Sequence, residues 1–157
     1  MPDPLLTYLQ DHLSGAKFAL TLLDDLAKQD VDSGVAELSK RLQIAIEEDR
    51  AALESCVKKL GGEPSALKEA AAWIAQKAGK AKLSTAALLG VFEAVELLVI
   101  GVTGKKALWK VLAEIDRSDL PLTPIELNEL MRRADEQAAL LEETRLRLGK
   151  DALSEPA

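Results

Sequence analysis

Apolar residues recur at alternating steps of three and four along four long segments of this chain, which is the spacing of a stripe on one face of an α-helix. In the first segment the stripe consists of Leu6, Leu9, Leu13, Ala16, Leu20, Leu23 and Ala27. A neighbouring row widens it with Leu5, His12, Ala19 and Leu26. Stripes of this width are stable only when they are buried against other helices, and 157 residues is a natural size for one compact domain. The pattern therefore predicts an all-α bundle.

The ends of the predicted helices carry typical capping residues. Asp3 followed by Pro4 is a common helix start, and Thr123 with Glu126 three residues later is a capping box. The predicted helices run from Asp3 to about Gln29, from Gly34 to Gly61, from Thr85 to Ile115 and from Thr123 to Gly149. Residues 1–149 are therefore expected to form a single helical-bundle domain, and residues 150–157 a frayed C-terminal tail.

The connection between the second and third predicted helices, from Glu63 to Thr85, is unusually long. Apolar residues within it predict a short helix from Ala66 to about Lys77. Antiparallel neighbours need only a few residues between them. The length therefore predicts a helical crossover.

Charge and composition argue against several classes of function. The net charge of -6 and the pI near 4.9 do not favour nucleic acid as a partner. Cys56 is the only cysteine, so no internal disulfide forms, and a cytoplasmic location is expected; no signal peptide is recognised. The apolar stretch from Ala86 to Val102 contains Glu93 and Glu96, which favours a buried central helix over a membrane span.

Two glycines interrupt the third predicted helix. Gly101 and Gly104 each cost about 1 kcal/mol against alanine in a helix interior. We expect a close approach of a neighbouring helix, or a local bend, to compensate for this cost.

The four amphipathic helices and the long connection resemble the ferritin-like superfamily. The similarity is carried by Asp3-Pro4-Leu5-Leu6, by Glu47-Glu48-Asp49-Arg50 and by Phe92-Glu93-Ala94-Val95-Glu96. It is similar to an uncharacterised bacterial branch of that superfamily and implies a four-helix bundle with a crossover. In metal-binding members two helices each supply a glutamate and two supply Glu-x-x-His, all facing inward.

The chain departs from that metal-binding pattern. The inward positions give Ile46-x-x-Asp49 in the second helix and Ala134-x-x-Gln137 in the fourth, and neither contains histidine. We therefore expect that the di-metal centre has been lost and that no cofactor is held. If a metal ion does bind, its ligands are expected to be Glu93, Glu96 and Asp49.

Several polar residues are nevertheless expected to project toward one central region. They are Asp49, Glu93, Glu96, Gln137 and His12. An unpaired carboxylate there would cost several kcal/mol unless it were protonated or hydrogen-bonded. Three interpretations stay open: a satisfied polar network, a single-metal or small polar ligand site, and a glutamate that faces solvent.

No catalytic constellation accompanies these residues. Cys56 lies in an apolar row, where a free cysteine behaves as a small hydrophobic residue. The segment from Gly101 to Lys106 lacks the spacing and the preceding strand of a phosphate-binding loop. We expect a non-enzymatic protein.

The preferred functional hypothesis is a ferritin-like bundle that acts through self-association, as a homodimer, or through an unknown protein partner. One alternative is a metal-binding or redox-linked stress protein that uses the residual carboxylates. The second is a carrier of an apolar small molecule, in a cavity left by small core residues such as Ala16, Ala45 and Ala134.

Overall fold

The computed structural model describes residues 3–63 and 85–156. These residues form helices α1 (Pro4–Lys28), α2 (Ser33–Lys59), α4 (Leu88–Glu114) and α5 (Pro124–Ala152), and no strand occurs among them. The all-α, four-helix prediction is therefore confirmed for the described residues. The short helix predicted from Ala66 lies outside them.

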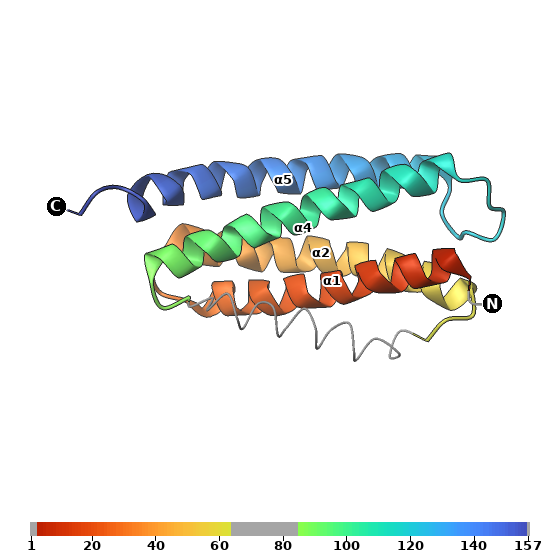
Figure 1. Ribbon diagram of the computed structural model, residues 1–157, viewed down its shortest axis with the longest axis horizontal. Helices are drawn as coiled ribbons and strands as arrows, with labels where there is room; N and C mark the ends of the chain where they lie inside the picture. Colours follow the sequence, from red (N-terminus) through yellow and green to blue (C-terminus); the bar gives the residue numbers. More distant parts are fainter. Residues whose placement is uncertain (1–2, 64–84, 157) are drawn as a thin grey trace.

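The four helices lie side by side as an elongated bundle (Figure 1). Helices α1 and α2 form one antiparallel pair, α4 and α5 form another, and α1 also contacts α4. The end of α2 and the start of α4 lie at opposite ends of the bundle (Figure 1). This placement is what a lengthwise connection requires, while the helical, ferritin-like form of the crossover stays a prediction.

The capping residues take the predicted roles at α1 and α5. Asp3 accepts a hydrogen bond from the Leu5 N–H at 2.9 Å. The Glu126 N–H donates to the Thr123 hydroxyl at 3.2 Å, and the Thr123 N–H donates to the Glu126 carboxylate at 2.7 Å. This reciprocal pair completes the predicted capping box.

The end of α5 differs from the prediction. The helix continues through Gly149 to Ala152, because Gly149 is a packing position and does not terminate it. A Cβ atom at this position would lie 2.9 Å from Cε2 of Phe92, so the aromatic ring fits against the helix only where no side chain is present. Residues 150–152 are therefore helical, and the predicted frayed tail starts too early.

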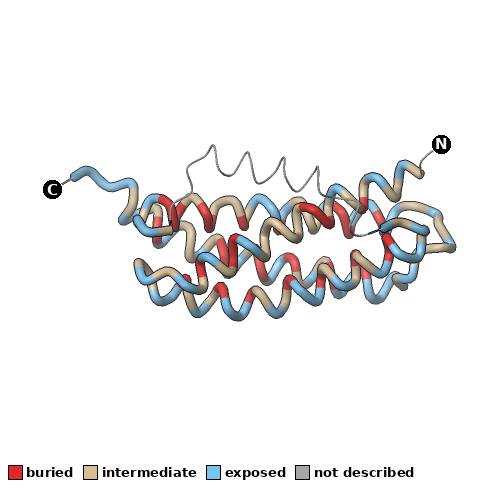
Figure 2. Tube along the Cα trace, turned by 90° about the horizontal axis from the view of Figure 1, so that it is seen from below, coloured by how far each residue is buried: buried red, intermediate tan, exposed pale blue. Residues whose placement is uncertain are grey.

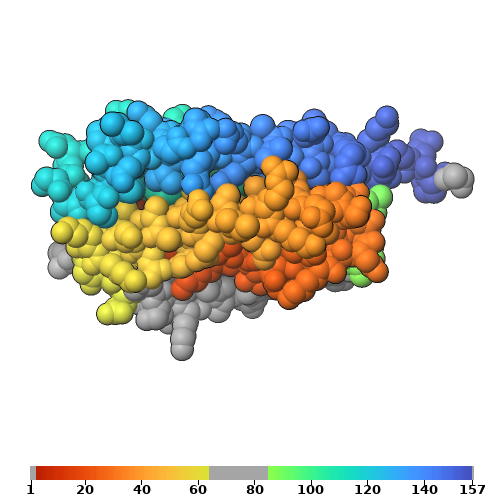
Figure 3. Space-filling view, turned by 180° about the vertical axis from the view of Figure 1, so that it is seen from behind, coloured from red at the N-terminus to blue at the C-terminus, as the bar shows by residue number. Residues whose placement is uncertain are grey.

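The turn between α1 and α2 is fixed by Asp32, which caps α2 and also reaches α5. Its carboxylate accepts a hydrogen bond from the Val35 N–H at 2.8 Å and pairs with Arg147 at 2.7 Å. The Arg147 guanidinium is the main cause that lowers the pKa of Asp32, with the backbone N–H groups of α2 adding to it. Figure 3 shows α2 and α5 side by side on this face of the molecule.

We expect Asp32→Ala to lower the free energy of unfolding by about 1 kcal/mol at neutral pH, because α2 loses its cap. Asp32→Asn keeps a side-chain oxygen that can accept the capping hydrogen bond and removes only the negative charge. The difference in stability between wild type and this variant therefore reports the contribution of the charge. Since the folded pKa is lowered, the charge stabilises above the unfolded pKa, and this stabilisation is lost as pH falls through the folded pKa. Urea titrations should show the gap between wild type and Asp32→Asn closing in acid; a constant gap would contradict this role.

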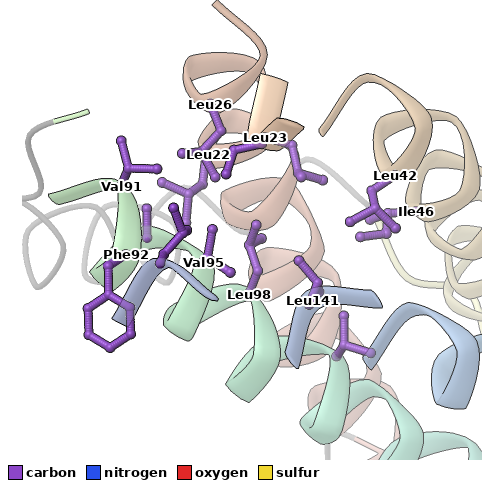
Figure 4. Close-up of a cluster of buried hydrophobic side chains, with 14 of the residues drawn as sticks. Leu22, Leu23, Leu26, Leu42, Ile46, Val91, Phe92, Val95, Leu98 and Leu141 are labelled. Carbon is purple, nitrogen blue, oxygen red and sulfur yellow. The ribbon is translucent and has the colours of Figure 1, made fainter. Parts of the chain in front are cut away.

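The apolar core is divided into two clusters along the bundle. One lies around the end of α1 and the start of α4, and Figure 4 labels Leu22, Leu23, Leu26, Leu42, Ile46, Val91, Phe92, Val95, Leu98 and Leu141. The other contains Leu9, Leu13, Leu53, Cys56, Val57, Leu108, Trp109, Leu112, Leu127 and Leu130. Buried positions follow the inner sides of the helices (Figure 2). On α2 and α4 the polar residues Asp49 and Lys105 lie between residues of the two clusters.

Helix α4 buries Gly90 and Phe92 as well as Val91 near its start, so more than one side of the helix is covered there, as expected for a central helix. No helix in the described part of the chain is long and apolar enough to cross a membrane.

Candidate functional site

Three polar residues replace apolar ones at a single level of the bundle, and we call them the polar layer: Asp49, Lys105 and Gln137. Each occupies a position of the inward-facing repeat of seven. Asp49 falls between Leu42 and Cys56 in α2, Lys105 between Leu98 and Leu112 in α4, and Gln137 seven residues after Leu130 in α5. The helix period therefore places all three in the interior.

Hydrogen bonds connect the members of the polar layer. The Lys105 ammonium donates to Asp49 Oδ2 at 2.6 Å and also to the Gln137 carbonyl oxygen. The Gln137 amide donates to Asp49 Oδ2 at 2.9 Å. Each residue is thus bonded to the other two, which joins α2, α4 and α5 at one level.

A second cation approaches Asp49 from α5. Arg133 Nη2 lies 3.1 Å from Asp49 Oδ1 and donates a hydrogen bond to the Ala45 carbonyl at 2.8 Å. Arg133 Nη1 donates to Glu48 at 2.8 Å. Asp49 Oδ1 accepts no hydrogen bond from a described residue, so Arg133 interacts with this oxygen through its charge and not through a hydrogen bond.

Because Asp49 and Lys105 are buried, the charged form of each is stabilised by the charge of the other. Asp49 is only 2% exposed, and the Lys105 side chain is 15% exposed. Loss of hydration lowers the pKa of Lys105, and the Asp49 carboxylate opposes that shift. Asp49 and Gln137 are hydrogen-bonded to each other, whereas Asp49 Oδ1 has no donor among the described residues, so this polar network is only partly satisfied.

No hydrogen bond joins the other predicted members of the central region to Asp49 or Gln137 among the described residues. Glu96 accepts a hydrogen bond from Arg145 at 3.0 Å, and its side chain is 44% exposed. Glu93 is partly exposed. The His12 ring is half-buried and meets the Tyr8 ring edge-on, with 4.7 Å between ring centroids. Of the five candidates, the structure joins only Asp49 and Gln137 by a hydrogen bond.

Sequence reasoning missed Lys105 and Arg133. A signal for Lys105 was present, because it continues the repeat of seven through Val91, Leu98 and Leu112. Arg133 precedes the inward-facing Ala134, and nothing in its spacing indicates that it reaches Asp49.

The donor set does not fit the di-metal centre that the ferritin-like resemblance implies. The Asp49 carboxylate faces the cations of Lys105 and Arg133, and Glu96 is bonded to Arg145. Within residues 3–63 and 85–156, no three His, Cys, Asp or Glu side chains form a group able to hold a metal ion. A bound cation would therefore have to displace positive charges that are already in place.

A pocket of about 400 Å³ opens beside the polar layer, between α1, α2 and α4, and we call it the α1–α4 pocket. Its lining is mainly apolar and includes Phe18, Leu22, Ile46, Leu97, Leu98 and Leu108. Asp49 and Lys105 also line it, so that the polar layer borders the pocket. His12 lines the same pocket, and burial lowers its pKa, which favours the neutral ring.

Three helical glycines line the α1–α4 pocket: Gly15 on α1, and Gly101 and Gly104 on α4. A Cβ atom built at any of them meets no described neighbour within 4 Å. No described residue makes the expected close approach at Gly101 and Gly104, and the alternative of a local bend stays a prediction. Within residues 3–63 and 85–156, nothing fills the space beside these positions.

Two buried polar atoms without a hydrogen-bond partner belong to residues that line this pocket. They are Asp49 Oδ1 and the indole nitrogen Nε1 of Trp109. Trp109 is fully buried. Buried donors are nearly always paired in native proteins, so the free indole N–H distinguishes this pocket from a simple packing defect.

Cys56 is a buried residue of the second apolar cluster. Burial raises the pKa of its thiol to about 11, which disfavours the reactive thiolate. We expect a thiol reagent such as Ellman's reagent to modify the native protein slowly and one thiol per chain to react rapidly in urea. Fast labelling without urea would show that this part of the core opens readily.

Comparisons of the chain with protein-family models, with curated proteins and with solved structures gave no match. The ferritin-like resemblance therefore stays a prediction, and the geometry of the polar layer and the pocket carries the functional argument.

Proposed function

We propose that this protein is a non-enzymatic binding protein that takes up a small apolar molecule in the α1–α4 pocket. The observation that carries the proposal is that no described residue fills the space beside Gly15, Gly101 and Gly104. Glycine inside a helix costs about 0.5–1 kcal/mol relative to alanine, and no described side chain packs at these positions to offset that cost. By having no side chains, the three glycines leave room in the pocket for a ligand.

The size and chemistry of the pocket support this proposal. Its volume of about 400 Å³ lies within the range of small-molecule sites, and its walls are mainly aliphatic and aromatic. The rigid ion-paired layer of Asp49 and Lys105 forms part of its wall. Of the functions left open by the sequence, the carrier of an apolar molecule is the one that uses these features.

The proposal is tested by titration with N-phenyl-1-naphthylamine, an uncharged apolar dye that fluoresces when it leaves water. We expect one saturable site per chain and displacement of the dye by other apolar molecules. Organic extraction of natively purified protein followed by mass spectrometry tests whether a molecule is retained. Absence of saturable dye binding would overturn the proposal.

The homodimer stays a prediction beside this proposal. Exposed apolar side chains such as Ile44 and Leu146 motivate it. Light scattering should give about twice the chain mass of 16.9 kDa if the prediction holds. A mass near that of one chain across micromolar concentrations would contradict it and leave the binding proposal unaffected.

A further inference from the structure

We infer that the α1–α4 pocket selects an uncharged ligand with an oxygen acceptor, such as a ketone, ester or ether, and that this oxygen accepts a hydrogen bond from the indole N–H of Trp109. The inference rests on the proposed function and specifies the class of ligand.

The buried indole N–H of Trp109 is the reason that the ligand needs a hydrogen-bond acceptor. Its indole nitrogen can only donate, it is fully buried, and it has no acceptor among the described residues. Trp109 belongs to the lining of the pocket and its indole nitrogen is closed to water, so a ligand oxygen reaches this nitrogen when the neighbouring side chains of the lining move aside. A purely hydrocarbon ligand would leave this donor unpaired, whereas a ligand oxygen would satisfy it.

The absence of net charge follows from the ion pairs around the pocket. Lys105 is bonded to Asp49 and Gln137. Arg50, the other cation among the described residues that line the pocket, is paired with Glu47 and Glu54. An anionic ligand would therefore find both cations already engaged and would lie close to the Asp49 carboxylate.

A cationic ligand is disfavoured for the complementary reason. Asp49 lies next to Lys105 and Arg133, and the exposed Asp11 is the remaining carboxylate in the pocket lining. Moving an unpaired charge from water into apolar surroundings is costly. An uncharged molecule with a single oxygen acceptor provides a partner for the Trp109 indole N–H and brings no unpaired charge into the pocket.

Benzophenone and diphenylmethane form a matched pair of probes, because they differ mainly in a carbonyl group that replaces a methylene group. Each would be titrated against dye-loaded wild type and Trp109→Phe, which removes the donor and keeps an aromatic ring. We expect Trp109→Phe to weaken benzophenone binding by about three- to tenfold more than diphenylmethane binding. The hydrocarbon thus corrects for any change in the shape of the pocket.

The wild-type protein provides a second measurement that does not depend on the variant. In ¹⁵N-labelled protein the Trp109 indole N–H resonance, assigned with Trp73→Phe, should move downfield with benzophenone and much less with diphenylmethane. The anion 4-benzoylbenzoate should bind at least about tenfold more weakly than benzophenone.

The possible outcomes separate the two proposals. If neither probe nor the dye binds to wild type, the proposed function itself fails. If both probes bind and the ratio of their affinities is the same in Trp109→Phe, binding stands and the role of Trp109 is overturned. Tighter binding of 4-benzoylbenzoate than of benzophenone would overturn the uncharged ligand class.

Discussion

Asp49→Ala is expected to lower the free energy of unfolding by about 3–5 kcal/mol, because it leaves a buried ammonium without its counter-ion. The Lys105 ammonium lies 2.6 Å from Asp49 and is bonded also to Gln137. With alanine at position 49, the carboxylate that opposes the desolvation of Lys105 is gone. Chemical denaturation followed by circular dichroism measures the loss.

The matched control is Asp135→Ala, which breaks another aspartate–lysine pair between helices, on the surface. Asp135 pairs with Lys106, the neighbour of Lys105, and its side chain is 60% exposed. Surface pairs contribute about 0–1 kcal/mol, so this variant should unfold almost as wild type does. Equal losses for the two alanine variants would contradict the buried-charge argument.

The pH dependence of Asp49→Ala provides an independent check. Removal of Asp49 should lower the pKa of Lys105 further, since Arg133 and desolvation both act in that direction. Between this lowered pKa and the ordinary lysine value, the folded protein binds fewer protons than the unfolded chain. Its stability should therefore rise with pH in that window. A flat profile would show that water reaches Lys105 in the variant.

The helix ends and the inward-facing polar positions could be predicted from the sequence because both depend on local spacing. Asp3 and the Thr123–Glu126 capping box are recognised within one turn of helix. Asp49 and Gln137 stand out because each interrupts an apolar row. These features need no knowledge of how the helices pack against one another.

The partners of Asp49 could not be predicted in the same way. Lysine in an apolar row commonly extends its ammonium to the surface, so Lys105 alone does not indicate a buried ion pair. Its bond to Asp49 joins residues 56 positions apart and depends on how α2 and α4 align along the bundle axis. The spacing of residues along the sequence does not determine how α2 and α4 align, so this ion pair could not be predicted from it.

Glycines are ambiguous for a related reason. A helical glycine indicates that a side chain is not needed, and it does not say whether a neighbour or empty space takes its place. At Gly149 the Phe92 ring occupies the space, whereas at Gly101 and Gly104 nothing described does. The three positions look alike in the sequence, and only the structure separates packing glycines from pocket glycines.

Filling the α1–α4 pocket should remove ligand binding without loss of stability. We expect the double variant Gly101→Leu/Gly104→Leu to weaken dye binding by at least about tenfold, because two isobutyl groups then occupy the space that the dye needs. Ala107→Leu is the matched control, since it adds the same type of side chain to an exposed position of α4 that does not line the pocket.

Alanine variants at the same two positions distinguish an effect on ligand binding from an effect on helix stability. Gly101→Ala and Gly104→Ala should each stabilise the fold by about 0.5–1 kcal/mol, because alanine favours the helix and its Cβ meets no described neighbour. A loss of stability would mean that the space is filled in solution. Increased stability together with weakened binding in the leucine variants would show that the glycines sacrifice helix stability for room in the pocket, as expected of residues that serve binding rather than folding.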